Sequence, residues 1–203
     1  MCPRDSPSSD NDLHRRAVLA GTAVVGFSAL AGCLDSSDGD ADAPDPIAID
    51  PDHACDNCTM RIGNFGGSAG QSFYDDPEAV LGPDDDTDRP AQFCSARCTY
   101  TFTFDHEAEA EPVVSYLTDY SAVDWSVDTG GDAPTMSRHL DADAFAPAAD
   151  LTLVVDSDVG GAMGGSLFGF STADDAESFQ AEYDGELYDH EDVSPTLIQS
   201  LMG

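Results

Sequence analysis

The segment Leu151–Val193, LTLVVDSDVGGAMGGSLFGFSTADDAESFQAEYDGELYDHEDV, contains the clearest succession of secondary-structure signals in the chain. It begins with a β-branched apolar run typical of a strand, and a glycine-rich turn leads into a second apolar run. The stretch STADDAESFQAEYDG then has helical periodicity, with Ala176, Phe179 and Tyr183 on one face. ELYDHEDV predicts a short closing strand. The segment therefore predicts the order strand, strand, helix, strand.

The preceding part of the chain has a similar plan. Residues 60–74, MRIGNFGGSAGQSFY, predict two strands around a glycine-rich turn, and residues 89–109 predict a strand leading into a helix. Residues 113–127 alternate in the manner of another strand. The repeat lies in the order of elements rather than in residue identity. We therefore predict an α+β fold with two small, similar ββαβ domains, at residues 51–129 and 130–203.

The N-terminal residues 1–32 are predicted to be a signal peptide. Arg15 and Arg16 precede an apolar run that is shorter than the about 20 residues needed to span a membrane. A charged start, a short apolar centre and a small-residue end are typical of secretory signals, and the paired arginines favour the twin-arginine route.

The sequence LAGC at residues 30–33 resembles a lipoprotein signal-peptidase box, in which the thiol of Cys33 takes the lipid. Residues 33–50 are rich in Asp, Ser, Gly, Ala and Pro and predict a flexible acidic tether. We expect the mature protein to be lipid-anchored on the extracytoplasmic face of the cell membrane.

The charge of the chain is strongly one-sided. Seven arginines and no lysine stand against 40 acidic residues, so the formal net charge is −33. Nucleic acid is excluded as a partner because phosphate binding needs Lys and Arg. The hydrophobic fraction of 41% argues for folded domains rather than disorder. We expect a protein that stays soluble at very high salt, where self-repulsion is screened, and hence a halophilic, archaeal source.

Four cysteines lie outside the predicted signal and lipid anchor: Cys55, Cys58, Cys94 and Cys98. The first two form a CxxC pair, and the other two would lie one turn apart on one face of a helix. Such a set can build a four-sulfur site suited to zinc or an iron–sulfur centre, two disulfides, or a reducible dithiol. We favour metal binding, because a methionine and two histidines (Met60, His53 and His106) lie nearby.

Met60 changes the expected metal. If residues 58–60 form a strand, Cys58 and Met60 share one face, and their sulfur atoms can converge on one ion. A thiolate and a thioether are soft ligands, which select Cu(I). The alternative is that Met60 is ordinary core packing. His53 is either a further ligand from just upstream or a solvated side chain.

The pattern Cys55-x-x-Cys58-x-Met60-x-Ile62 resembles the signature of the NosL family, copper-chaperone lipoproteins that assist nitrous oxide reductase. The lipoprotein box, the stretch QSFY…AQFCSARCTYTF and Leu151–Val193 are also similar to that family. The resemblance implies two ββαβ units, with Cu(I) bound outside the cytoplasm and passed to the reductase. It implies Cys58 and Met60 as copper ligands, together with Cys55.

Two features depart from the family pattern. Cys94 and Cys98 exceed its minimal cysteine content, and Ala162 stands where the family usually has proline before a Met-Gly turn. Met163 in that turn is either a third copper ligand or docking point, or a methionine that covers the hairpin. Met136 and His139 form an M-x-x-H that could hold copper if the segment is ordered, but we favour a loop-surface position for both.

We expect a metallochaperone rather than an enzyme, because no Ser/His/Asp or Cys/His/Asn arrangement and no phosphate-cradling loop is evident. The expected cargo is Cu(I), with Zn as the alternative, and the expected client is a copper enzyme, nitrous oxide reductase. Two chains could share one ion as a homodimer. The competing hypotheses are a structural-zinc or metal-sensing module built from the four cysteines, and an extracytoplasmic thiol oxidoreductase.

Overall fold

The computed structural model describes residues 43–83, 89–162 and 164–202. The predicted signal peptide, the lipidation candidate Cys33 and the candidate ligand Met163 lie outside these residues. Among the described residues, no helix has both the length and the apolar character needed to cross a membrane.

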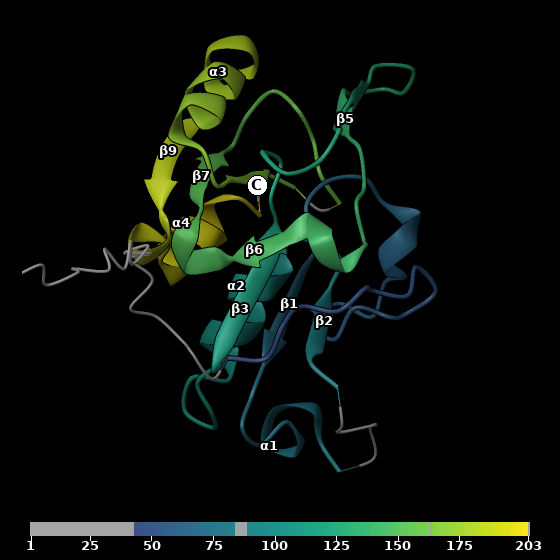
Figure 1. The fold of residues 1–203 in the computed structure, drawn as a ribbon, viewed down its shortest axis with the longest axis vertical. Helices are drawn as coiled ribbons and strands as arrows, with labels where there is room; N and C mark the ends of the chain where they lie inside the picture. The colour runs from purple at the N-terminus through teal and green to yellow at the C-terminus, as the bar shows by residue number, and fades with distance from the viewer. Residues whose placement is uncertain (1–42, 84–88, 163, 203) are drawn as a thin grey trace, which may run out of the picture. The chain divides into compact units, whose positions relative to one another are not determined.

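The first sheet has four antiparallel strands in the order β2-β1-β3-β6 (Figure 1). Its strands are β1 (Gly70–Phe73), β2 (Ala91–Phe93), β3 (Val114–Thr118) and β6 (Phe145–Pro147). Helix α2 (Ala96–Asp105) covers one face of this sheet, and the short helix α1 (Glu78–Leu81) lies between β1 and β2 in the chain.

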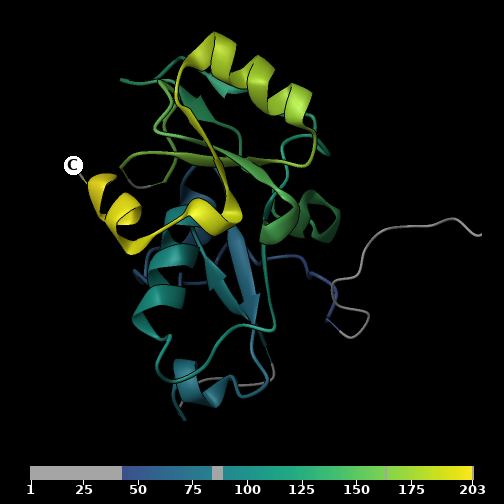
Figure 2. The same cartoon turned by 90° about the vertical axis from the view of Figure 1, so that its left-hand side faces the viewer.

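The second sheet has three antiparallel strands in the order β8-β7-β9. Its strands are β7 (Thr152–Val155), β8 (Leu167–Phe170) and β9 (Glu186–Asp189), and helix α3 (Ala173–Tyr183) packs against it (Figure 2). The chain then continues through a 3₁₀ turn, η4 (His190–Asp192), to helix α4 (Pro195–Ser200). A separate two-stranded ribbon pairs β4 (Val127–Asp128) with β5 (Thr135–Met136).

The remaining regular elements are three short 3₁₀ turns: η1 (Ile62–Asn64), η2 (Ala142–Ala144) and η3 (Ala148–Asp150).

The predicted α+β class is confirmed. The order strand, strand, helix, strand is found in β7-β8-α3-β9 and, apart from the short helix α1 between β1 and β2, in β1-β2-α2-β3. In α3, Ala176 and Phe179 are buried, so the predicted apolar face is the one that packs. The predicted boundary at residues 129 and 130 does not coincide with the limits of the first sheet, because β6 comes from beyond it and pairs with β3.

Two local predictions are wrong. Residues 60–74 contain one strand, because the backbone before β1 bonds to the preceding turn: Ile62 N–H donates to His53 O and Gly63 N–H to Pro51 O. The predicted tether also ends earlier than residue 50. Ile49 is buried, and the Gln71 side chain accepts from the backbone N–H of Ile47 and donates to its carbonyl.

The hydrophobic core has three parts. One lies under the first sheet and includes Ile62, Phe93 and Phe102 together with three cysteines. A second joins α2 to β7, and a third fills the space between the second sheet and α3. The backbone also connects the two sheets, since Tyr120 N–H donates to Gly169 O at 2.8 Å. The cysteines are therefore part of a packed core.

Candidate metal site

The CxxC pair lies in a tight turn that runs from Cys55 to Met60. Cys55 N–H donates to Met60 O at 2.8 Å, Thr59 N–H donates to Cys55 O at 2.8 Å, and Ala54 bridges to Arg61. Thr59 has φ 64°, a left-handed conformation that is rare for a β-branched residue. The prediction of a strand at residues 58–60 is therefore wrong, because a tight turn with a left-handed residue cannot keep the alternation of an extended strand.

The consequence for Met60 is direct. Its expected place beside Cys58 relied on both residues sharing one strand face, and that geometry is absent. Met60 is half-buried and its carbonyl closes the turn. Its role as a copper ligand stays a prediction.

The second cysteine pair surrounds the start of helix α2. Ser95 is the N-cap, and its Oγ accepts from Cys98 N–H at 3.0 Å. Cys94 precedes the cap and Cys98 lies in the first helical turn, so the two do not share a helix face as predicted. Their sulfur atoms are nevertheless 3.7 Å apart. The N-terminal end of a helix favours negative charge and hence thiolate.

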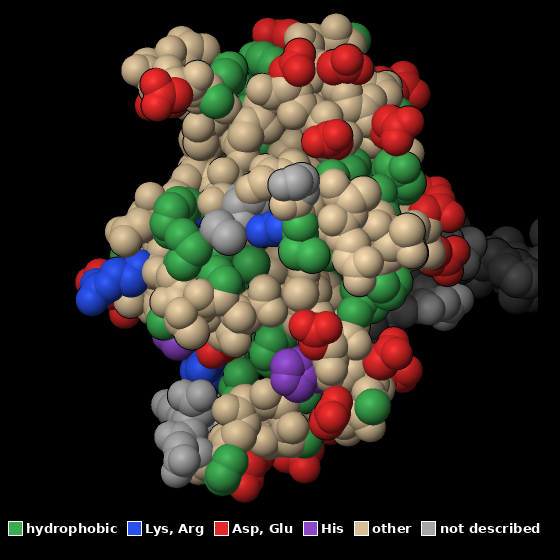
Figure 3. Space-filling view, turned by 180° about the vertical axis from the view of Figure 1, so that it is seen from behind, with side chains coloured by type: hydrophobic (Ala, Val, Ile, Leu, Met, Phe, Trp, Pro, Cys, Tyr) green, Lys and Arg blue, Asp and Glu red, His purple; other side chains and the backbone are tan. Residues whose placement is uncertain are grey.

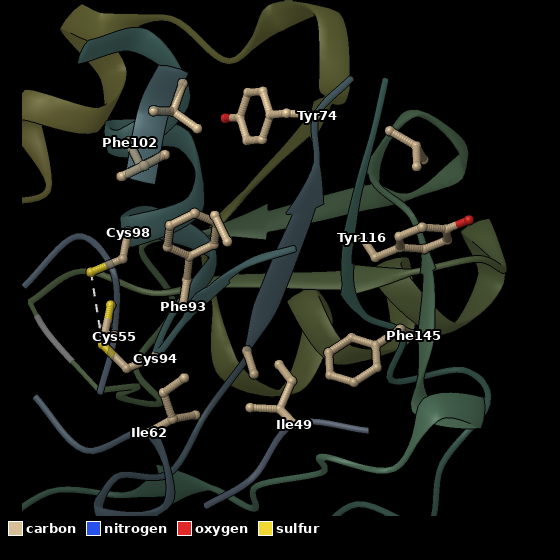
Figure 4. Close-up of a cluster of buried hydrophobic side chains, with 14 residues drawn as sticks. Ile49, Cys55, Ile62, Tyr74, Phe93, Cys94, Cys98, Phe102, Tyr116 and Phe145 are labelled. Carbon is tan, nitrogen blue, oxygen red and sulfur yellow. Dashed lines mark hydrogen bonds between the residues drawn. The ribbon is translucent and has the colours of Figure 1, made fainter. Parts of the chain in front are cut away.

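The two pairs converge on one place. All four Sγ atoms lie within 4.8 Å of one another, and Cys58 Sγ is 3.5 Å from Cys94 Sγ. Cys55, Cys94 and Cys98 are buried, whereas Cys58 is half-buried. Figure 4 shows the three buried sulfur atoms gathered at the edge of the core beside Phe93. All four are free thiols, separated by more than the about 2.05 Å of a disulfide bond.

The distances fit a metal ion. Four sulfur atoms placed about 2.3 Å from a central ion in a tetrahedron are separated by about 3.8 Å. The separations of 3.5 Å between Cys58 and Cys94 and 3.7 Å between Cys94 and Cys98 are close to that value. The other pairs lie within 4.8 Å, so sulfur–sulfur separations need to shorten by at most about 1 Å for the four atoms to enclose one ion.

The thiols share their protons unevenly. Hydrogen bonds from Cys55 and Cys94 lower the pKa of Cys98 well below its ordinary value. Hydrogen bonds with Cys55 and Cys98, together with burial, raise the pKa of Cys94. For Cys55, a hydrogen bond with Cys94 is outweighed by one with Cys98 and by burial, so its pKa is raised. Of the three buried thiols, Cys98 is therefore the one whose thiolate form is most favoured by its surroundings.

The histidines do not join this cluster. Among the described residues, the four cysteines are the one group of three or more metal-ligating side chains whose ligand atoms all lie within 4.8 Å of one another. His53 Nε2 lies 3.8 Å from Asp56 Oδ2 instead. His106 is the C-cap of α2, at the opposite end from Cys98, where its Nδ1 is 2.9 Å from Phe102 O.

The M-x-x-H segment has a different role from the one expected. Met136 is only 1% exposed and packs in the third part of the core, so its predicted loop-surface position is wrong. Met136 lies in β5, where it pairs with Val127 of β4, and this pairing places its side chain in the core. His139 is half-buried, with Nε2 3.0 Å from Ser137 Oγ.

Two charged side chains anchor the CxxC turn. The Asp56 carboxylate accepts from the Arg89 guanidinium at 2.7 and 2.8 Å, and from Gln92 N–H at 2.6 Å. Because Gln92 belongs to β2, these bonds tie the turn to the strand that leads to Cys94. Such bidentate arginine–carboxylate pairs are among the stronger hydrogen-bonded contacts in proteins.

A third charged side chain, Arg138, reaches the other cysteine pair. Its guanidinium donates to the carbonyl oxygens of Phe65, Gly66, Ser68 and Cys94. Burial lowers the pKa of Arg138, while Tyr120 and the thiols of Cys94 and Cys55 act in the opposite direction. Sequence reasoning missed Arg138, Arg89 and Asp56. The sequence did offer one signal that these arginines have specific roles: residues 43–203 contain only four arginines and no lysine.

Comparisons with known proteins give one family and one solved structure to report. The family model NosL matches residues 46–198. The crystal structure of the copper chaperone NosL from Shewanella denitrificans is similar, with a TM-score of 0.57 and 26% sequence identity. The match covers 73% of this chain and 95% of that chain. A search of curated proteins found no match.

Proposed function

The chain belongs to the NosL family, and we propose that it is a metallochaperone that binds Cu(I) at the four-cysteine site and delivers it to a copper enzyme. The observation that carries this proposal is the convergence of four free thiols from two distant segments within 4.8 Å. Thiolates are soft ligands that suit Cu(I). The similar solved protein is described as a copper chaperone.

The protein is not an enzyme, as predicted, because the family to which it belongs is non-enzymatic. A chaperone of this kind must hold its cargo and also release it. The chemistry of the site therefore has to be ligand exchange rather than catalysis.

The exposure of the cysteines suggests how release begins. Cys58 is half-buried and lies in a turn, whereas the other three thiols are buried. Cu(I) is satisfied by fewer than four thiolates, so a soft ligand from a client can bind the ion while the Cys58 sulfur leaves it. The buried thiols follow as the client supplies further ligands. Cys58 is thus the first ligand to exchange in the proposed transfer.

The proposed client, location, additional ligands and oligomeric state rest on sequence features. The proposed client is nitrous oxide reductase, in line with the family signature at residues 55–62. The proposed location is the extracytoplasmic face of the cell membrane, with a lipid on Cys33. Met60 and Met163 remain proposed additional ligands, and a homodimer that shares one ion remains a proposed arrangement.

A structural-zinc or metal-sensing module is the second candidate. It is favoured by one observation: the sulfur separations of 3.5 and 3.7 Å match a closed tetrahedral tetrathiolate. Such a site would hold its ion through all four cysteines and would resist ligand exchange.

Anaerobic titration of the reduced protein with Cu(I) and with Zn(II), each in competition with a chelator, separates the two functions. We expect Cu(I) to bind more tightly and to pass rapidly to a second chelator. Zn(II) bound with all four thiols protected, in a form that does not exchange, would instead establish the structural site. Metal binding unchanged in Met60→Ala would remove Met60 from the ligand set.

A further inference from the structure

Arg138 and Arg97 differ from the other two arginines of residues 43–203, because neither forms an ion pair with a carboxylate of the described residues. The four arginines of residues 43–203 all lie in or against the cysteine-bearing segments, although the chain has 40 acidic residues. Arg61 pairs with Asp52 and Arg89 with Asp56. Among the described residues, no carboxylate lies within ion-pair distance of Arg138. Its positive charge is therefore half-buried without a carboxylate to offset it.

Acidic side chains are abundant on the surface of the molecule, although none of them pairs with Arg138 among the described residues. Figure 3 shows carboxylates over the top, the right-hand side and the lower part of one face, with few arginine side chains among them. In a protein so rich in acids, a carboxylate partner for a buried guanidinium is the ordinary solution. At Arg138, four backbone carbonyls accept from the guanidinium instead, and the thiols of Cys94 and Cys55 interact with it electrostatically.

The contacts of Arg138 are directed at the cysteine site. Nε donates to Phe65 O at 2.6 Å, and Nη1 donates to Ser68 O at 3.3 Å. Nη2 donates to Gly66 O and to Cys94 O, both at 2.9 Å. One rigid side chain therefore connects the loop before β1 to the residue that carries a central sulfur atom of the cluster.

The packing around this side chain is close. A Cβ atom added at Gly66 would clash with the carbonyl oxygen of Met136, so the loop at residues 65–68 and the strand before Arg138 are in direct contact. The guanidinium thus has little freedom, and its charge is held at a defined distance from the thiols.

We propose that Arg138 is a positioning residue for the metal site, which holds the Cys94 backbone in place and offsets the negative charge of the metal–thiolate cluster. This inference rests on the proposed metal-binding function. Several thiolates around one Cu(I) or Zn(II) ion keep a net negative charge, and three of these cysteines are buried. A buried negative cluster is costly unless a cation or hydrogen-bond donors lie beside it.

The test uses Arg138→Gln, which keeps two donors and loses the charge, and Arg138→Lys, which keeps the charge and loses the forked geometry. We expect Arg138→Gln to weaken Cu(I) affinity by about 10- to 100-fold in a chelator competition, the range typical of groups that support metal ligands. Arg138→Lys should recover part of that loss. The matched control Arg61→Gln removes an exposed arginine from the same region and should stay within about 3-fold of the unmodified protein.

The rise in Tm on metal binding separates this role from a purely structural one. We expect the metal-induced rise to shrink in Arg138→Gln. A variant that lowers Tm equally with and without metal, and keeps its affinity, would overturn the inference. So would equal losses of affinity in the Gln and Lys variants. If the unmodified protein binds Zn(II) but not Cu(I), the proposed function fails, and the same variants measured with Zn(II) still decide the role of Arg138.

Discussion

The two ββαβ halves of the molecule differ most at the junction between a strand and its helix. In the first half, β2 is followed by Cys94, the N-cap Ser95 and then Cys98 in the first turn of α2. In the second half, β8 is followed by Ser171 and the N-cap Thr172 at the start of α3. The scaffold is the same, and only one of the two helix starts carries sulfur.

The two junctions also have different neighbours. Cys94 faces the CxxC turn, with Cys58 Sγ at 3.5 Å. Ser171 N–H instead donates to Asp119 Oδ1 at 2.9 Å, and Thr172 N–H donates to Ser121 Oγ. One helix start therefore contributes two thiols to the four-cysteine cluster, while the other bonds to the segment that follows β3. The difference indicates that the shared strand–helix junction gathers thiols only in the half where the CxxC turn packs against it.

The largest expected effect concerns the core of the half without cysteines. Phe179→Ala should lower the free energy of unfolding by about 3–5 kcal/mol, because Phe179 is 2% exposed and packs from α3 against the second sheet. Denaturant unfolding measures this loss. The affinity of the folded protein for Cu(I) should not change.

Phe102→Ala is the matched variant in the first half. Phe102 is buried in the same part of the core as Cys98, so this variant should lose both stability and metal affinity. Equal effects of the two variants on metal affinity would show that the halves are not functionally distinct.

The next largest effect is expected when the β2–α2 junction is made to resemble the β8–α3 junction. Cys94→Ser gives the first half the residue that Ser171 provides in the second, and it removes a sulfur atom that lies within 3.7 Å of two others. We expect Cu(I) affinity to fall by more than about 100-fold, beyond the loss typical of groups that only support ligands. Ser171→Ala is the control and should keep full affinity, as judged by chelator competition.

A smaller effect is expected at the helix caps. Ser95→Ala should cost about 1 kcal/mol of stability, because Ser95 Oγ accepts from Cys98 N–H. Thr172 makes no side-chain cap bond, so Thr172→Ala should cost less. Thermal unfolding of the two variants side by side measures the difference. A larger loss of stability in Thr172→Ala than in Ser95→Ala would contradict the conclusion that only Ser95 makes a stabilising side-chain cap.

The smallest effect concerns the contact between the halves. His190 Nδ1 is 2.9 Å from Tyr100 OH, and burial lowers the pKa of His190. The folded protein therefore favours the neutral imidazole, so this contribution to stability is present above the ordinary histidine pKa and is lost as pH falls below it. His190→Gln should flatten the fall in Tm between pH 7 and pH 5. An unchanged pH profile would show that this imidazole does not couple to folding.

Much of the architecture could be predicted because it depends on local patterns. The periodicity of Ala176 and Phe179 predicted the packed face of α3, and the β-branched run at Thr152–Val155 predicted β7. The turn around Cys58 was missed because Thr59 adopts a left-handed conformation that its residue type disfavours. Short apolar stretches near such turns do not reveal from sequence whether the chain extends or folds back.

The sequence by itself determined the residue types of the site: four cysteines in two closely spaced pairs, a family signature and an extreme scarcity of cations. Only the tertiary structure decided that Cys55 and Cys58 join Cys94 and Cys98 in one cluster, and that Arg138 lies against it. The reason is physical. Spacing along the chain restricts neighbours within one turn, whereas contacts between residues 36 or 44 positions apart depend on how sheets and loops pack.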